Sequence, residues 1–123
     1  MYTDFTQMPV WKNAMDIAVE VFYISESLPR KEDYALTSQI RRSAESISSN
    51  ITEGFGRGGD KEKVMFYRFA RGSANETKNH LIYGDLVKYF DSEKVAPLIM
   101  KIESLVHELN KIIKTLENKG GKN

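Results

Sequence analysis

The sequence predicts an all-α protein, folded as an antiparallel up-down four-helix bundle. Apolar residues recur at spacings of three and four along most of the chain, and no segment has the two-residue alternation typical of a strand. The three prolines stand at positions 9, 29 and 97, so the segments between them are long enough for extended helices. A chain of 123 residues suits a single domain with one core.

The first helix is expected over residues 10–28 and the second over residues 34–54. Pro29 ends the first, because proline lacks the amide that the next turn needs. Asp33 or Thr37 is expected to cap the second, and Gly54 to stop it by supplying a positive φ. The apolar stripe of the first helix comprises Trp11, Ala14, Met15, Ala18, Val21, Phe22 and Ser25, and Ile17 and Ile24 widen this apolar face.

The third helix is expected over residues 60–90, with Asp60 as its N-cap, and the fourth over residues 93–118. The stripe of the third comprises Phe66, Phe69, Ala70, Ser73, Thr77, Leu81 and Gly84. The fourth carries the most regular heptad, comprising Val95, Leu98, Ile102, Leu105, Leu109, Ile112 and Leu116. These large residues are expected to face the small ones of the second and third helices. Residues 119–123 are expected to fray.

A ridge of polar and mostly small side chains flanks the isoleucines of the second helix. It comprises Gln39, Ser43, Ser46, Asn50 and Glu53. Serine and asparagine compete with a helix for backbone hydrogen bonds, so their use here favours a place where another helix approaches, inside the subunit or across a subunit interface. Solvent exposure and a ligand site are the alternatives. With Gly72, Ser73 and Glu76 on the third helix, the ridge forms the candidate helix–helix or subunit interface.

The composition argues against several classes of function. The formal net charge is +1, without the basic excess of a dedicated nucleic-acid packer, and cysteine is absent, which fits a reducing cytoplasm. Neither a signal peptide nor a membrane segment is expected. Gly54, Gly56 and Gly59 match the dinucleotide-binding pattern, but they follow a helix instead of a strand. His80 and His107 belong to no ligand-spaced motif, so we expect no enzyme activity, metal or cofactor.

Basic residues concentrate in the segment from Arg41 to Arg71, which has a local excess of positive charge. Aromatic residues are interleaved with them, a mixture suited to phosphate contact and base stacking. The alternative is that the aromatic residues belong to the core and the charges lie on solvated helix faces. The candidate nucleic-acid-binding residues are Arg41, Arg42, Arg57, Lys61, Lys63, Arg68 and Arg71.

Two stretches carry a family resemblance: YALTSQIRRSAESISSNITEGFGR at residues 34–57 and FYRFARGSANE at residues 66–76. They resemble the small four-helix-bundle proteins encoded within intervening sequences of bacterial 23S ribosomal RNA genes. Thr52 departs from the alanine most often present there. That family is related to the accessory variability proteins of diversity-generating retroelements, which form pentameric barrels implicated in nucleic-acid binding. The resemblance therefore implies a ring-shaped homo-pentamer and contact with RNA or DNA.

The expected function is that of a non-enzymatic, homo-oligomeric accessory protein that binds nucleic acid through a basic surface repeated around the oligomer. The alternative is a structural or protein-interaction module whose partner is another protein and which makes no nucleic-acid contact. Salt separates the two hypotheses, because contacts to phosphate weaken steeply as the salt concentration rises.

Overall fold

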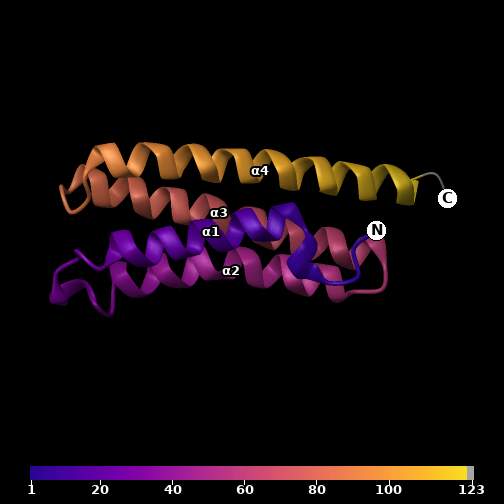
Figure 1. Ribbon diagram of the computed structural model, residues 1–123, viewed down its shortest axis with the longest axis horizontal. Helices are drawn as coiled ribbons and strands as arrows, with labels where there is room; N and C mark the ends of the chain where they lie inside the picture. The colour runs from indigo at the N-terminus through magenta and orange to yellow at the C-terminus, as the bar shows by residue number, and fades with distance from the viewer. Residues whose placement is uncertain (122–123) are drawn as a thin grey trace.

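The computed structural model describes residues 1–121, which form four long helices in an antiparallel bundle (Figure 1). The helices are α1 (Pro9–Ser25), α2 (Leu36–Gly56), α3 (Asp60–Leu86) and α4 (Ser92–Gly121), with short 3-10 turns at Phe5–Gln7 and Arg30–Glu32. No strand forms within residues 1–121, so the all-helical prediction is confirmed. None of the helices in this part of the chain is long and apolar enough to cross a membrane.

Helix α1 ends earlier than the sequence predicts, at Ser25 instead of residue 28. The hydroxyl of Ser25 donates to the carbonyl of Phe22 (2.8 Å), and that of Ser27 donates to the carbonyl of Ile24 (3.0 Å). These bonds occupy carbonyl groups that have no amide partner at the end of a helix. The serines therefore close the helix before Pro29 is reached.

The start of α2 differs from both expected caps. Ala35 holds the N-cap position without a side-chain bond, so the prediction that Asp33 or Thr37 caps this helix is wrong. The preceding 3-10 turn places Glu32 beside the helix, where its carboxylate accepts a hydrogen bond from the Leu36 amide at 3.3 Å. The Glu32 carboxylate, which precedes the helix, thus takes the place of an N-cap side chain, because it satisfies an amide that has no partner within the helix.

The glycine cluster does not stop α2 in the predicted way. The helix continues past Gly54 to Gly56, and no glycine among the described residues has a positive φ. Gly54 is glycine because Tyr67 of α3 packs on it: a Cβ there would lie 2.6 Å from the ring carbon Cε1. The chain then turns through extended backbone at Arg57 and Gly59. Gly54 therefore serves helix packing, Gly56 is the last residue of α2, and Gly58 and Gly59 lie in the connection.

Both ends of α3 also depart from prediction. Gly59 is its N-cap and Asp60 is its first residue, where a carboxylate suits the positive end of the helix dipole. The helix ends at Leu86 instead of residue 90, because Lys88 adopts a positive φ of 69°. The amides of the two residues after Lys88 donate to the carbonyl of Gly84 at 2.8 and 3.1 Å.

Helix α4 is longer than predicted at both ends. Asp91 precedes it and accepts a hydrogen bond from the Glu93 amide at 3.0 Å, so the helix begins at Ser92. It continues to Gly121, through the first three residues of the predicted frayed tail. The rest of that tail, residues 122 and 123, lies outside the described residues.

The core runs the length of the bundle and departs from the predicted stripes in α1 and α3; in α4, Ile113 is buried while the predicted Ile112 is only half-buried. Phe22 and Phe69 are exposed, by 44% and 52%, whereas the spacing placed both inside.

In α3, Ala70, Thr77, Leu81 and Gly84 are buried as predicted. Val64, Tyr67 and Ala74 take the other core positions in place of Phe66, Phe69 and Ser73, because the face that packs on α2 lies beside the predicted one.

Helix α4 lies next to α1 and α3 and diagonally across from α2, so its backbone approaches α3 closely, as expected, and does not approach α2. The apolar side chains of α2 and α4 belong to the same core.

Candidate nucleic-acid interface

The central serines of the predicted ridge join α2 to α3 within one subunit. The hydroxyls of Ser43 and Thr77 are hydrogen-bonded at 2.8 Å in the core, and Ser73 donates to Ser46 at 3.1 Å. Asn50 donates to the carbonyl of Ser46 at 2.8 Å and so stays on its own helix. Short hydroxyl side chains let the two helix backbones approach while keeping each polar atom bonded. This is the physical reason for so many small polar residues in α2.

The other predicted interface residues lie on the surface. Gln39 and Glu53 on α2 are exposed, as is Gly72 on α3. Glu76 is exposed too, and its carboxylate lies 3.3 Å from the His80 ring one turn further along α3. The structure therefore divides the predicted interface into an internal seam and an outer set of residues that no part of the described chain covers.

The seven predicted basic residues also separate, into three groups. Three of them lie at the α2–α3 connection, namely Arg57, Lys61 and Lys63. Arg57 stacks over the ring of Phe66, 4.6 Å from its centroid. The same guanidinium pairs with the carboxylates of Glu53 and Glu62, each at 3.5 Å. Lys61 is exposed and makes no hydrogen bond or ion pair with the described residues. Arg57 is thus oriented by its neighbours, and Lys61 is available to a ligand.

Lys63 belongs to the same connection but has a structural task. Its ammonium group donates to the carbonyls of Gly54 (3.2 Å) and Phe55 (2.9 Å) at the end of α2. A cation at this position satisfies carbonyls that lack helical partners and complements the negative end of the helix dipole. We therefore assign Lys63 to the end of α2, and of the three basic residues at this connection only Arg57 and Lys61 are classed as exposed.

The second group lines a groove between α1 and α2. Arg41 donates from Nε to the hydroxyl of Ser25 at 2.7 Å and lies 4.5 Å above the centre of the Phe22 ring. Arg42 is exposed and has no hydrogen bond or ion pair within the described chain. Both arginines border a hollow of about 440 Å³ with an apolar floor that includes Val19.

The third group joins α3 to α4. Arg68 forms an ion pair with Glu117, and Arg71 donates to the side-chain carbonyl of Asn110 at 2.8 Å. These contacts connect segments that are far apart in the sequence, so periodicity alone gives no sign of them. The structure therefore does not gather the seven residues into one patch.

Sequence reasoning missed part of the charge at the α2–α3 connection. The antiparallel order places the start of α1 and the end of α4 at this same end of the bundle (Figure 1). Lysines from both helices lie there, namely Lys12, Lys111, Lys114 and Lys119. Two features of the sequence could have identified these lysines: the last turns of the fourth helix are rich in lysine, and the predicted up-down topology brings them to this end of the bundle. The end of the bundle formed by residues 1–12, 53–63 and 111–119 is termed the turn end.

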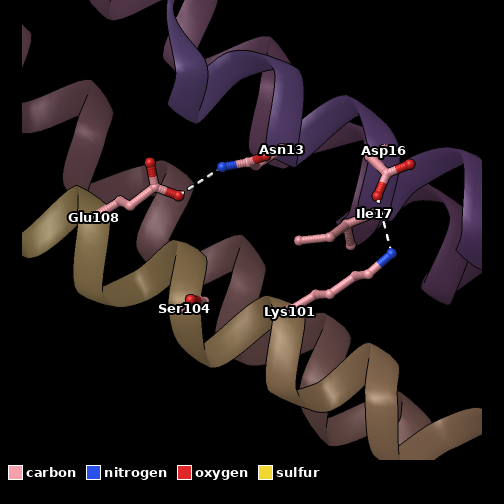
Figure 2. Close-up of a pocket in the computed structure, with 6 residues that line it drawn as sticks. All are labelled: Asn13, Asp16, Ile17, Lys101, Ser104 and Glu108. Atoms are coloured by element: carbon pink, nitrogen blue, oxygen red, sulfur yellow. Dashed lines mark hydrogen bonds and ion pairs between the residues drawn. The ribbon is translucent and has the colours of Figure 1, made fainter.

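A separate pocket of about 190 Å³ lies between α1 and α4 (Figure 2). Asn13 donates to Glu108 at 2.8 Å on one side of Ile17, and Lys101 donates to Asp16 at 3.2 Å on the other. Lys101 also donates to Glu20 at 2.6 Å, and this bond, followed by the one to Asp16, raises the lysine pKa above its usual value. The lysine stays protonated, so it is no general base or nucleophile at neutral pH. The pairs hold α1 to α4.

Within residues 1–121, no group of three or more His, Cys, Asp or Glu side chains is arranged to hold a metal ion. The observed features define a small four-helix-bundle protein in which polar side chains join α1 to α4, α2 to α3 and α3 to α4. Residues 6–111 match the family model described as 23S rRNA-intervening sequence protein. The chain belongs to this family.

The fold is shared with a crystal structure of a protein of unknown function from the S23 ribosomal protein family of Bacteroides thetaiotaomicron. The two are similar with a TM-score of 0.79 and 24% sequence identity, over 85% of this chain and 98% of the other. At this identity the likeness supports the fold and carries no statement about activity. No curated protein matches this chain.

Proposed function

We propose that this protein is a non-enzymatic, homo-oligomeric accessory protein of the cytoplasm that binds RNA or DNA at the turn end. The observation that carries the proposal is the uneven charge along the bundle. The turn end holds more Lys and Arg than Asp and Glu, whereas the opposite end, formed by residues 24–35 and 82–96, has the reverse balance. An anionic polymer is attracted to the first end and repelled from the second.

The turn end offers the groups that a phosphate backbone requires. Lys61 is exposed and unpaired in the described chain, and Arg57 is held over an aromatic ring with its fork of donors at the surface. The lysines of α4 add positive charge at the same end. At 0.1 M salt a charge acts on a ligand over a screening length of roughly 10 Å, so these lysines also attract an anion bound near Arg57 and Lys61. No helix-turn-helix or RNA-recognition motif accompanies them, so binding is expected to depend weakly on base sequence.

Self-association is the second part of the proposal. It is supported by large apolar side chains that the described chain leaves exposed on α1 and α3, including Phe22, Met65, Phe69 and Tyr83. The pentameric ring comes from the family resemblance noted in the sequence. A ring would repeat the turn end around its axis and multiply a small local charge.

A gel-shift titration of wild-type protein with structured RNA, single strands and duplex DNA tests the nucleic-acid part. The double reversal Arg57→Glu and Lys61→Glu is expected to weaken binding to all of these ligands and to flatten the salt dependence. The slope should fall by roughly 0.7 to 0.9 for each phosphate group that the variant no longer neutralises. Arg30→Glu with Lys31→Glu is the matched control, because it reverses as many charges at the opposite end.

Unchanged affinity in the turn-end variant, or equal weakening in both variants, would contradict the proposed site. Absence of any binding at low salt would favour the alternative, a protein-interaction module. The observation that favours this alternative is that Lys63, Arg68 and Arg71 are engaged within the chain. Light scattering on a sizing column tests the assembly, and a monomer at tens of micromolar would refute it.

A further inference from the structure

One face of α3 carries exposed residues that the subunit itself does not explain. Met65, Phe69, Gly72, Glu76 and Tyr83 follow one another at spacings of three, four and seven, and all are exposed. These five residues are termed the α3 stripe. Such spacings place them on one side of a helix. Two of the large apolar residues, Phe69 and Tyr83, each expose about half of their surface, at 52% and 51%.

Gly72 is the most informative member of the α3 stripe. Glycine inside a helix is unfavourable relative to alanine, so a packing reason is expected. Gly54 and Gly84 have one, since a Cβ there would lie within 2.6 Å of Tyr67 and 2.3 Å of Phe90, respectively. A Cβ at Gly72 would meet nothing within 4 Å. The subunit therefore supplies no packing reason for Gly72, whereas a second helix that approaches the backbone of α3 closely would supply one.

The groove between α1 and α2 has the complementary chemistry. Val19 and Phe22 form an exposed apolar floor, and Arg41 is fixed against Ser25 at its border. Glu45 also lines the groove, which measures about 440 Å³, so its two arginines leave an excess of positive charge. Arg42 forms no ion pair with any carboxylate of the described chain. The groove thus has room for apolar side chains and offers guanidinium donors that match a carboxylate.

We propose that the α3 stripe of one copy packs into the α1–α2 groove of a second copy, with Glu76 of the stripe facing Arg42 of the groove. This inference rests on the homo-oligomeric part of the proposed function. Phe69 meets the apolar floor, and Gly72 lets the two helices approach closely. The stripe and the groove are different surfaces of one chain, so the contact is heterologous and repeats from copy to copy, as ring formation requires.

Pairing of the stripe with itself is less favourable. It would leave the groove arginines without a carboxylate from the second copy and the apolar floor exposed. The stripe-to-groove contact covers both surfaces at once and pairs opposite charges, so charge complementarity selects it. The turn end takes no part in this contact and remains open to nucleic acid.

Sedimentation equilibrium of charge-reversed variants tests the contact. Glu76→Arg and Arg42→Glu are each expected to weaken association at least tenfold, because like charges then face each other. The variant that carries both reversals restores an opposite pair and is expected to recover association to within about threefold of wild type. Met100→Lys is the control, since this exposed methionine lies on α4, away from both surfaces.

Gly72→Ala provides a second readout that does not depend on charge. The added methyl group has open space in the subunit, so it is expected to raise the melting temperature of dissociated protein while weakening association. If Gly72 had only a role inside the subunit, Gly72→Ala would change the melting temperature of the dissociated protein and the strength of association in the same direction. This variant keeps the inference falsifiable if a charge reversal fails to fold.

The outcomes separate this inference from the proposed function. A wild-type monomer at tens of micromolar refutes self-association and the contact with it. A wild-type oligomer whose mass is unchanged by Glu76→Arg and by Arg42→Glu refutes the contact alone. Weaker nucleic-acid binding in Arg42→Glu without any change of mass would assign the groove to nucleic acid and would also overturn the contact.

Discussion

Adding a methyl group at Gly54 tests the packing that positions the turn end. In Gly54→Ala the new Cβ would lie 2.6 Å from Cε1, 3.0 Å from Cδ1 and 3.1 Å from Cζ of Tyr67. Favourable carbon–carbon contacts are about 3.5 to 4.0 Å, so the ring must move by roughly 1 Å. Tyr67 is only 3% exposed, and its ring lies against the backbone of α2. The ring therefore has little free space into which it can move.

The expected cost follows from two opposing effects. Overpacking of a filled core costs about 1 to 3 kcal/mol, while replacing glycine by alanine in a helix returns about 0.5 to 1 kcal/mol. The difference spans about 0 to 2.5 kcal/mol, and its mid-range value is a net destabilisation of about 1.25 kcal/mol. For a domain of this size, 1 kcal/mol corresponds to about 3 to 6 °C in melting temperature. At the mid-range value, Gly54→Ala is thus expected to melt about 4 to 8 °C below wild type.

Thermal unfolding followed by circular dichroism, at one fixed protein concentration, measures this shift. Gly56→Ala is the matched control, because it adds the same methyl group two residues further along α2, where nothing lies within 4 Å. The control is expected to melt within about 3 °C of wild type or slightly above it. A Gly54→Ala protein as stable as this control would show that Tyr67 does not rest on the glycine, and the account of the α2–α3 packing would be wrong.

Two further perturbations test the core and the alkaline limit of stability. Leu109→Asp places an unpaired charge at a fully buried position and is expected to abolish cooperative unfolding, at a cost above about 4 kcal/mol, whereas exposed Asn118→Asp on the same helix changes little. A wild-type melting curve for Leu109→Asp would place this seam in solvent. Burial raises the pKa of Tyr67 above 10.0, so the stability it contributes is complete below that pH and is lost as the pH rises through the higher folded value. The melting temperature is therefore expected to fall above about pH 10, and less so in Tyr67→Phe; identical alkaline profiles would refute this cause.

The sequence predicts the core of α4 well because its pattern is strong and one-sided. Leu98, Ile102, Leu105 and Leu109 recur at heptad spacing and are all buried, with charged residues on the opposite face. Helix α3 has no such contrast. Phe69 and Tyr67 are both large and aromatic, and the spacing favoured the one that proves to be exposed. Which side of α3 faces inward depends on where Gly54 of α2 leaves room for a ring, and that is a tertiary property.

The candidate site was predicted less well, because ion pairs depend on which helices are neighbours. Arg68 belongs to the basic segment in the sequence, yet its carboxylate partner, Glu117, lies on α4. Lys63 is a type of residue that binds phosphate, but here its ammonium group donates to backbone carbonyls at the end of α2. Charge counted along the chain therefore overstated one segment and missed the lysines that the topology brings to the same end.

The unpartnered surfaces of α1, α2 and α3 bear on nucleic-acid binding at the turn end, because association through these surfaces would bring several turn ends together. The excess of positive charge on one subunit is small, so a single copy offers few phosphate contacts and weak binding. In a closed ring all copies are related by rotation about one axis, and their turn ends lie on the same rim. A long nucleic acid that contacts one turn end then meets the next at high effective concentration, which raises its affinity without any new type of contact. Because the proposed subunit contact uses the flanks of the bundle, such an assembly would leave every turn end accessible. The rim that carries the turn ends would then present a stronger positive field than one subunit does, although each chain is nearly neutral.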